Sequence, residues 1–430
     1  MRPTGGMGMR GWVRGVATAA AAVALAGCWP APGQGPHRQG YNPFERTLTI
    51  DNVTTLQPEW DVTGLGSNLV TADGVVVSAG GNTMGGFDVA TGTSRWTVQG
   101  VGSIPRGAPV ISDGAVYQSQ TVLSSSTSSY DLQTGQSQPQ GFDGQVAGFD
   151  GTRALVEQAV TDSNFTSATY SFSVEDRDAP DTGWGGVTLI TANPFTESVR
   201  TSLGTNQVYA SGFGLMATTP GDATSGTAIR AFGPHQPATC GPADNPVYAC
   251  PLWVTPIAET SEFPEATAPL IGPGEETVYV GTDTGAVYAI DATSGAVRWT
   301  ASLGARIRTQ PSLANGLLYV PVYSGDVQVL AADGCGAPTC APAWTASTGG
   351  VTYSQPAIAG GVLFVGTDTG EIQAFDAAGC DAATCAPVWS HDLGGSVTGP
   401  IVSGGRLIVG TSGGRLMSFR PTPPPAASGP

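Results

Sequence analysis

Apolar and polar residues alternate along residues 277–300 in a pattern that predicts three consecutive antiparallel strands. The first run passes through Val278 and Val280 and the second through Val287 and Ala289, with turns rich in Asp, Thr, Ser and Gly between the runs. Outside the first 27 residues, no long window has the apolar spacing of an amphipathic helix. The chain has 62 Gly, 33 Pro and only 12% charged residues, which favours an all-β fold.

The same pattern returns with a period close to 45 residues. Tryptophans at positions 253, 299, 344 and 389 are 46, 45 and 45 residues apart, and prolines at 269, 311, 356 and 400 are 42, 45 and 44 apart. The turn sequence Gly-Thr-Asp-Thr-Gly occurs at 281–285 and at 366–370. A repeat of this length is typical of a four-stranded propeller blade, in which we expect each tryptophan to close one blade and dock on the next.

The number of blades and the closure of the ring follow from the ends of the repeat region. From Val53 to Arg420 there is room for eight units, or for seven if residues 145–255 hold one unit with large loops instead of two. The last unit stops before a tryptophan, whereas Leu56–Asp61 contains one with no strands before it. We therefore expect an all-β propeller of eight four-stranded blades, alternatively seven, closed by pairing of this N-terminal strand with the C-terminal blade.

Residues 1–27 have the features of an export signal. Three arginines and no acidic residue precede a run of small apolar residues at 16–26, which is too short to span a bilayer. The run ends in Leu-Ala-Gly-Cys28, which looks like a bacterial lipobox and predicts that Cys28 carries lipid. An ordinary secretory signal or a short membrane anchor is the alternative. With the Ala- and Gly-rich composition, this predicts a protein of a high-GC bacterium, outside the cytoplasm and lipid-anchored to the cell membrane.

The regions that flank the repeats are expected to lie outside the folded core. Residues 28–50 are rich in Pro, Gly and Gln and have no periodicity, so we expect the lipidated cysteine to be followed by a flexible spacer. Residues 421–430 form a Pro-rich tail. The propeller would then occupy residues 51–420.

The charge balance argues against two classes of partner. The chain has a formal net charge of -16, and removing the three arginines of the signal leaves 14 basic against 33 acidic residues, or -19. This argues against nucleic acid and against electrostatic adhesion to anionic lipid. We expect contact with the membrane through the lipid anchor only.

Besides Cys28, the six remaining cysteines fall into three close pairs. Outside the cytoplasm these predict the disulfides Cys240–Cys250, Cys335–Cys340 and Cys380–Cys385. A zinc site built from the last two pairs is the alternative. Equivalent positions in neighbouring repeats should lie more than about 10 Å apart, whereas zinc requires four ligands about 2.3 Å from one metal.

The twelve residues Tyr-Ala-Ile-Asp-Ala-Thr-Ser-Gly-Ala-Val-Arg-Trp at 288–299 resemble the pyrroloquinoline-quinone-like (PQQ-like) β-propeller repeat, in which an aspartate, a glycine and a tryptophan recur at this spacing. Residues 87–96 match as well, and 375–389 match with a cysteine loop inserted. The resemblance covers residues from about 55 to 420, is strongest after 265 and implies the propeller fold. Relatives with this repeat include quinoprotein dehydrogenases and non-enzymatic envelope lipoproteins, such as the propeller subunit of the outer-membrane β-barrel assembly machinery.

The resemblance also implies which groups a dehydrogenase of this family would contain. Those enzymes hold the quinone in the central channel with a calcium ion, a catalytic aspartate and, in many, a disulfide between adjacent cysteines. No two cysteines are adjacent in this chain, and no motif supplies the calcium ligands. We therefore expect no cofactor, metal or catalytic residue, and keep PQQ with calcium as the alternative.

Two patterns resemble hydrolase motifs. Gly-Thr-Ser412-Gly-Gly fits the G-x-S-x-G pattern, but its register in the repeat predicts a turn between two strands, not the strand-to-helix turn of a nucleophile. Ser390, His391 and Asp392 are neighbours in sequence and cannot converge as a triad. Neither pattern predicts catalysis.

Some carboxylates could in principle bind metal. Asp283 and Asp368 lie in the Gly-Thr-Asp-Thr-Gly turns, where we expect each aspartate to bond its own backbone two residues on. The acidic clusters at 175–178 and 259–276 are expected to be solvated loops and not calcium sites.

The most informative positions lie three residues before each starting proline, where the innermost strand begins beside the channel mouth. They hold Arg106, Ala266, Arg308, Tyr353 and Val397. Two arginines and a tyrosine at one opening could bind an anionic or extended ligand, whereas a plain solvated rim is the alternative. Arg106, Arg308 and Tyr353 are therefore the candidate binding residues.

These observations predict a monomeric, membrane-anchored, non-enzymatic propeller that acts as a binding or scaffold module for a protein, a peptide or an envelope glycan. A PQQ-dependent dehydrogenase, or a degenerate relative of one, is the alternative. A sensor ectodomain is disfavoured because no transmembrane helix or kinase domain follows the repeats.

Overall fold

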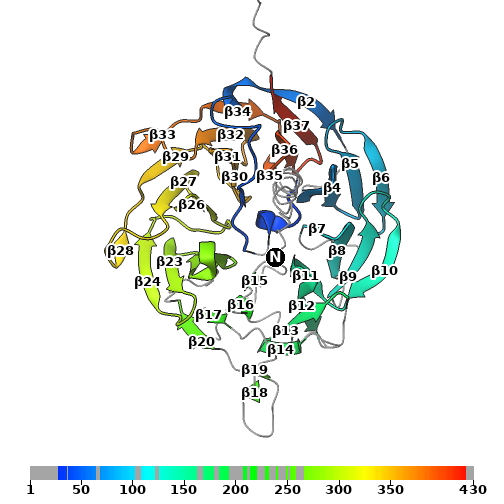
Figure 1. The fold of residues 1–430 in the computed structure, drawn as a ribbon. Coiled ribbons are helices and arrows are strands. Elements are labelled where there is room, and N and C mark those ends of the chain that lie inside the picture. Colours follow the sequence, from blue (N-terminus) through cyan, green and yellow to red (C-terminus); the bar gives the residue numbers. More distant parts are fainter. Residues whose placement is uncertain are drawn as a thin grey trace, which may run out of the picture.

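The computed structural model of the protein describes residues 28–35, 37–63, 68–101, 108–121, 125–161, 168–178, 184–192, 207–210, 214–219, 228–231, 239–240, 248–249, 252–257 and 266–422. Their regular structure consists of β-strands and short 3-10 turns, and none of their helices is long and apolar enough to cross a membrane. The sheets are arranged around a common centre (Figure 1), which confirms the predicted all-β propeller.

In the first half of the ring, each sheet places its first strand near the centre and its last strand at the rim (Figure 1). The strands of these four sheets are β3 (Asn68–Ala72), β4 (Val75–Gly80), β5 (Thr83–Asp88) and β6 (Ser94–Gln99); β7 (Val110–Ser112), β8 (Ala115–Thr121), β9 (Ser125–Asp131) and β10 (Ser137–Phe142); β11 (Gln145–Asp150), β12 (Arg153–Thr161), β13 (Ala168–Asp176) and β14 (Trp184–Ala192); and β15 (Gln207–Ala210), β16 (Gly214–Thr219), β17 (Ala228–Ala231) and β20 (Trp253–Pro256). Residues 145–256 thus contain two four-stranded sheets.

The second half repeats this order and adds strands from elsewhere in the chain. Its sheets contain β21 (Leu270–Ile271), β22 (Thr277–Gly281), β23 (Ala286–Asp291) and β24 (Val297–Ser302); β25 (Ser312–Ala314), β26 (Leu317–Val322), β27 (Asp326–Ala331) and β29 (Trp344–Ser347); β30 (Ala357–Ala359), β31 (Val362–Gly366), β32 (Glu371–Asp376) and β34 (Trp389–Asp392); and β35 (Val397–Ser403), β36 (Arg406–Thr411) and β37 (Leu416–Pro421). Together with the first half, the described strands form eight sheets of four or five strands. The sequence predicted eight blades, with seven as the alternative.

The last of these sheets receives its outer strand from the N-terminal side of the repeats. Strand β2 (Leu56–Val62) pairs antiparallel with β37, from Leu56 opposite Pro421 to Val62 opposite Leu416. This is the pairing expected from the lone tryptophan of Leu56–Asp61. One apolar cluster spans β2, the last two sheets and the first sheet, so the junction is buried.

A tryptophan on the outer strand of one blade docks on a turn of the next blade. The indole Nε1 of Trp60 donates to the carbonyl of Val89 at 3.0 Å. The same bond joins Trp96 to Leu132, Trp253 to Ala292 and Trp299 to Ala332. Gly92 lies under Trp60 with a φ of +70°, and a Cβ there would come within 2.7 Å of the indole. The predicted role of the tryptophans is confirmed at these four interfaces.

At three of these four interfaces, an aspartate folds the turn that receives the indole: Asp88, Asp131 and Asp291. The Asp291 carboxylate accepts hydrogen bonds from the backbone N–H groups of Thr293 and Ser294 and from the Arg298 guanidinium. These bonds, chiefly the one from Arg298, hold the pKa of Asp291 below its ordinary value. The Asp-x-x-x-Gly spacing of the repeat therefore describes an Asx turn followed by a glycine that accommodates the indole.

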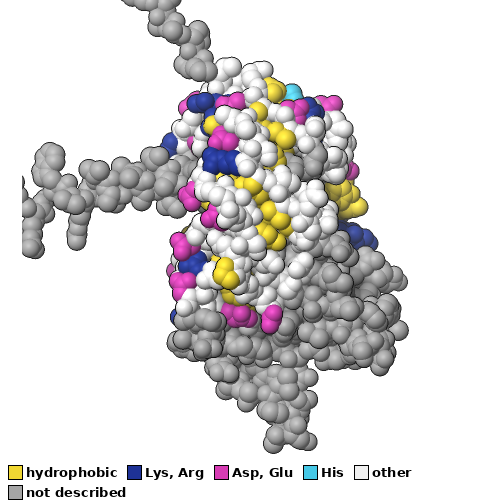
Figure 2. All heavy atoms as spheres, turned by 90° about the vertical axis from the view of Figure 1, so that its right-hand side faces the viewer, with side chains coloured by type: hydrophobic (Ala, Val, Ile, Leu, Met, Phe, Trp, Pro, Cys, Tyr) yellow, Lys and Arg dark blue, Asp and Glu magenta, His cyan; other side chains and the backbone are white. Residues whose placement is uncertain are grey.

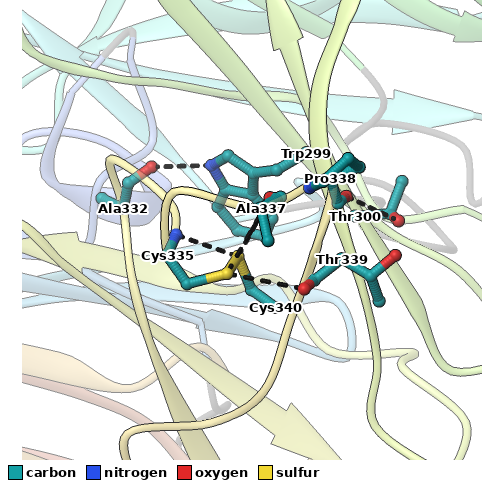
Figure 3. The surroundings of a disulfide bond; sticks show 8 residues. All are labelled: Trp299, Thr300, Ala332, Cys335, Ala337, Pro338, Thr339 and Cys340. Carbon is teal, nitrogen blue, oxygen red and sulfur yellow. Dashed lines mark hydrogen bonds between the residues drawn. A yellow bond between two sulfur atoms is a disulfide. The ribbon is translucent and has the colours of Figure 1, made fainter.

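Each of the two disulfide loops in the second half pairs with a strand of the preceding blade. Cys335–Cys340 and Cys380–Cys385 are both bonded, which confirms these two predictions and excludes the zinc alternative for their sulfurs. Strand β28 (Thr339–Cys340) pairs parallel with β24, and β33 (Thr384–Cys385) pairs parallel with β29 of the preceding blade. Figure 3 shows the first loop beside Trp299, with the Thr300 hydroxyl bonded to Pro338. The predicted Cys240–Cys250 bond lies outside the described residues.

Residues 28–50 do not form the flexible spacer that the composition predicted. They cross the middle of the ring as the dark-blue segment of Figure 1, and their backbone bonds to the innermost strands. Trp29 is buried and pairs with Thr71 of β3, and β1 (Tyr41–Asn42) pairs parallel with β30. The carbonyls of Pro30, His37, Gln39 and Gly40 accept from the backbone N–H groups of Ile111, Ile271, Leu313 and Ile358. The composition predicted a flexible spacer because it contains no information about the strand edges to which this segment bonds.

A buried carboxylate fixes the end of this segment. Glu45 is 1% exposed, and its Oε1 accepts from the backbone N–H groups of Arg46, Thr47 and Leu48. Its Oε2 accepts from the N–H of Gly405 in the last blade. The segment is therefore held by a buried, hydrogen-bonded charge as well as by its backbone.

Trp344 provides an internal comparison for the docking bond, the hydrogen bond from an indole Nε1 to a carbonyl of the next blade. Its indole is buried, but its Nε1 has no hydrogen-bond partner among the described residues. The equivalent carbonyl, that of Ala377, accepts instead from the Tyr319 hydroxyl at 2.7 Å.

We expect Trp60→Phe to lower the free energy of unfolding by at least about 1 kcal/mol more than Trp344→Phe, because only Trp60 loses a buried hydrogen bond. Both substitutions remove the same atoms from a buried ring, so Trp344→Phe controls for the change in volume. Equilibrium denaturation by urea measures the difference. Equal losses for the two variants would contradict a stabilising role for the docking bond.

Candidate functional site

The two described candidate residues meet at one mouth of the channel, through a tyrosine that the sequence analysis did not select. Arg308 lies in the connection between β24 and β25, Tyr353 in the connection between β29 and β30, and Tyr323 in the turn between β26 and β27. The Arg308 Cζ lies 5.6 Å from the centroid of the Tyr323 ring. The hydroxyls of Tyr323 and Tyr353 are 3.3 Å apart. These contacts form one cluster, which we call the Arg–Tyr mouth.

The aromatic pair is accessible from solvent. Tyr323 is 42% exposed and Tyr353 is 56% exposed. Their rings meet edge to face, at 70° and a centroid distance of 6.0 Å. The hydrogen bond from Tyr323 is the main cause that raises the pKa of the Tyr353 hydroxyl above its ordinary value. Both tyrosines thus present hydroxyls and apolar ring edges beside a guanidinium.

A buried carboxylate holds the arginines in place. Asp283, in the turn between β22 and β23, is 3% exposed, and its Oδ1 accepts from the Arg308 Nε at 2.6 Å. The Nε of Arg306 lies 3.7 Å from the other carboxylate oxygen. Two guanidiniums therefore share the Asp283 carboxylate. Guanidinium groups can bind anionic groups through charge-assisted hydrogen bonds.

The predicted turn geometry of Asp283 and Asp368 needs correction. Both residues lie in the expected strand-to-strand turns, but neither carboxylate bonds its own backbone two residues on. Asp283 binds the arginines, and the Asp368 Oδ1 accepts from the backbone N–H of Val351 at 2.8 Å. Asp368 thereby fixes the connection that carries Tyr353. The aspartates of these turns position the Arg–Tyr mouth because a turn and the following interblade connection lie at the same end of the ring.

Polar side chains follow Arg308 and precede and follow Tyr353 in the two interblade connections. The Thr309 hydroxyl donates to the carbonyl of Thr352 at 2.6 Å and joins the two interblade connections. Among the described residues, Gln310 Nε2, Thr352 Oγ1 and Ser354 Oγ are buried and have no hydrogen-bond partner. Buried polar atoms are usually paired with protein or with ordered water.

The remaining positions of the predicted rim differ. Val397 is buried, and the backbone of Ala266 forms a bridge with Thr282, so neither offers a polar side chain to the mouth. Arg106 lies outside the described residues. Tyr323 could have been found by aligning the turns, because in Pro-Val-Tyr323-Ser-Gly it occupies the third position, where Asp283 and Asp368 occur.

The other sequence motifs are structural. Ser412 lies in the turn between β36 and β37, as its register predicted. In the cluster at 175–178, Arg177 pairs with Asp178 and with Asp113, and part of 259–276 lies outside the described residues. Nowhere in the described part of the chain do three His, Cys, Asp or Glu side chains gather in a group that could hold a metal.

A calcium-bound quinone is not matched by the described channel residues. They supply no metal-ligating group of three, and residues 37–42 bond to β21, β25 and β30 at the end of the ring opposite the mouth. The buried carboxylate nearest to the mouth, Asp283, is engaged by two arginines. We therefore derive no reaction step through a quinone.

Comparison with known proteins supports the fold and the repeat. Residues 251–337 and 335–422 each match the family model PQQ_2, described as outer membrane protein assembly factor BamB. This confirms the predicted resemblance to the PQQ-like β-propeller repeat family. No curated protein matches the chain in sequence.

Solved structures with the same fold have different origins. A europium-containing methanol dehydrogenase is 12% identical with a TM-score of 0.63, over 93% of this chain and 99% of its own. The quinohemoprotein alcohol dehydrogenase of Comamonas testosteroni is 13% identical with a TM-score of 0.60, over 96% and 84%. The computationally designed Ika8 protein is 13% identical with a TM-score of 0.56, over 84% and 98%. At these identities the likeness concerns the fold alone.

We expect Tyr323→Phe to lower the pKa of Tyr353 toward its ordinary value, because the substitution removes the hydroxyl that hydrogen-bonds to Tyr353. NMR of the chain labelled with ¹³C at tyrosine Cζ, titrated from neutral to alkaline pH, would measure this shift. The resonance of Tyr319, whose pKa is raised by burial, serves as an internal control that should not move. An unchanged Tyr353 titration would show that the two hydroxyls are not coupled.

Proposed function

We propose that the protein is a non-enzymatic binding or scaffold module, anchored by lipid on Cys28 outside the cytoplasm, that binds a protein, a peptide or an envelope glycan at the Arg–Tyr mouth. The observation that carries the proposal is the convergence of Arg306, Arg308, Tyr323 and Tyr353 at one end of the channel. Function is expected where the blades differ, and these residues occupy variable positions of the repeat.

The chemistry of the mouth supports recognition and not turnover. Guanidinium groups bind carboxylates and phosphates through charge-assisted hydrogen bonds, and exposed tyrosines contribute contact area with little loss of conformational entropy. Asp283 is paired with arginine, and the Arg–Tyr mouth contains no histidine, cysteine or lysine to act as a base or nucleophile. A site of this kind orients a ligand without activating it.

The alternative is a quinone-dependent dehydrogenase or a degenerate relative. The fold is compatible with this alternative, but the described channel residues do not support it. The fold is shared by proteins whose titles name dehydrogenases and by a designed protein, so it does not separate the two functions. The strand edges that line the channel opposite the mouth are bonded to residues 37–42 of the chain itself. This arrangement favours the binding module.

A photo-crosslinking amino acid at Tyr353, in cells that produce the full chain, tests the binding site. We expect adducts with a protein, a peptide or a glycan at this position and none with these partners at Thr293, an exposed residue in a turn at the other end of the blades. Arg306→Ala together with Arg308→Ala should reduce the adduct by about tenfold or more, because each charged hydrogen bond contributes about 1.5–3 kcal/mol. Equal adducts at both positions, or adducts unaffected by loss of the arginines, would contradict the proposed site.

Incubation of the purified protein with pyrroloquinoline quinone and calcium tests the alternative. We expect no retention of the quinone on gel filtration and no dye-linked oxidation of alcohols or sugars, because the described channel residues offer no ligand group for the metal. A quinone-dependent dehydrogenase treated in the same way is the positive control. Clear oxidation that requires both quinone and calcium would overturn the non-enzymatic function.

A further inference from the structure

No flexible linker separates Cys28 from the ring, because the next residue, Trp29, is bonded to the innermost strand of the first blade. Trp29, the next residue, is 4% exposed, and it exchanges two backbone hydrogen bonds with Thr71 at 2.6 and 2.9 Å. Pro30 then accepts from the N–H of Ile111 at 2.6 Å. Cys28 is half-buried and packs against the apolar cluster of the first blade. A group attached to Cys28 is therefore fixed relative to the propeller, and not tethered at a distance.

The position of Cys28 defines one face of the ring. The backbone of Asp73, in the turn between β3 and β4, hydrogen-bonds to the Cys28 thiol. This turn adjoins the turn between β5 and β6, because Val89 donates to the carbonyl of Gly74. In the blade of β21–β24, Ala292 and Glu276 are bonded in the same way. The turns at 73–74, 88–92, 276 and 291–295 thus lie on the face that holds Cys28, which we call the anchor face.

The Arg–Tyr mouth lies at the opposite end of the blades. The N-terminal segment contacts Leu313 and Ile358 in β25 and β30, close to the turns that follow these strands. Arg308 and Tyr353 precede the same two strands. Since consecutive strands of a blade alternate in direction, turns such as that of Tyr323 lie on the mouth side, and turns such as that of Asp291 lie on the anchor face.

We propose that the anchor face lies directly against a lipid bilayer, so that the Arg–Tyr mouth points away from the membrane. This rests on the proposed lipid anchor at Cys28 and goes beyond it, because it assigns a membrane-facing surface and a fixed orientation. The acyl chains leave the protein next to a buried, hydrogen-bonded residue near the ring axis. A ring held in this way lies flat on the membrane instead of hanging from a flexible linker.

Two carboxylates of the anchor face are paired with arginines. Asp88 pairs with Arg95 at 2.6 Å, and Asp291 pairs with Arg298 at 2.7 Å. Figure 2 shows acidic and basic side chains side by side along the left edge of the ring, the side that faces the viewer in Figure 1. Partial self-neutralisation reduces repulsion from headgroups, but it supplies no basic patch for anionic lipid. The bilayer contact therefore depends on the anchor and not on charge attraction.

Fluorescence quenching in vesicles tests the orientation. The full chain, lipidated in a bacterial host, is purified and reconstituted into phosphatidylcholine vesicles that contain a headgroup-labelled quencher lipid. A fluorophore is attached at Thr293→Cys on the anchor face or at Ser412→Cys on the mouth side, both in exposed turns. We expect quenching at 293 to exceed that at 412 severalfold. Equal quenching, or stronger quenching at 412, in vesicle-bound protein would overturn the orientation while leaving the anchor intact.

An insertion variant provides the matched control. Twelve Gly and Ser residues between Cys28 and Trp29 would add a tether with a root-mean-square length of about 20 Å. We expect this variant to float with the vesicles as well as the parent protein and to lose most of the quenching difference. A parent protein that does not float would overturn both the anchor and the orientation, and an unchanged difference in the insertion variant would overturn the rigid connection.

Discussion

The docking of an outer-strand tryptophan on the turn of the next blade is the contact on which the ring depends. At Trp60 and Val89 this contact joins the last sheet to the first, so the bond that repeats around the ring also closes it. The turn can receive the indole because an aspartate such as Asp291 folds it and a glycine leaves room for the ring. The most recurrent residues of the sequence are therefore used by the architecture, and recognition is left to positions at which the blades differ.

A second constraint comes from the centre of the ring. The innermost strand of each blade has one backbone edge without a partner in its own sheet, and exposed edges of this kind must be covered or hydrated. Residues 29–42 cover edges in β3, β7, β21, β25 and β30 with their own carbonyls and N–H groups, and Glu45 ties the segment to the last blade. A segment without apolar periodicity is ordered here because its partners are backbone groups that already lie in register.

Sequence reasoning was accurate where the repeat carries the information. The strands at 277–300, the docking of Trp299 and the role of Leu56–Asp61 follow from self-similarity, and the loops of Cys335 and Cys380 follow from even pairing of cysteines. It failed for residues 28–50, because their contacts are to distant strands and leave no local pattern. For the site it selected Arg308 and Tyr353 but missed Tyr323, which replaces the repeated turn aspartate, and it assigned Asp283 a local bond instead of its bond to Arg308.

The two ends of the ring consequently have different chemistry, although every blade contributes strands of the same kind. At one end Asp88 and Asp291 pair with arginines, and the N-terminal segment bonds to the strand edges. At the other end Asp283 aligns two arginines and two tyrosines stay exposed. Gln310 and Thr352 there have buried polar atoms without a partner in the part of the chain that the structure describes. Among the residues that the structure describes, the segment that covers strand edges at the ring's centre lies at the end opposite the Arg–Tyr mouth.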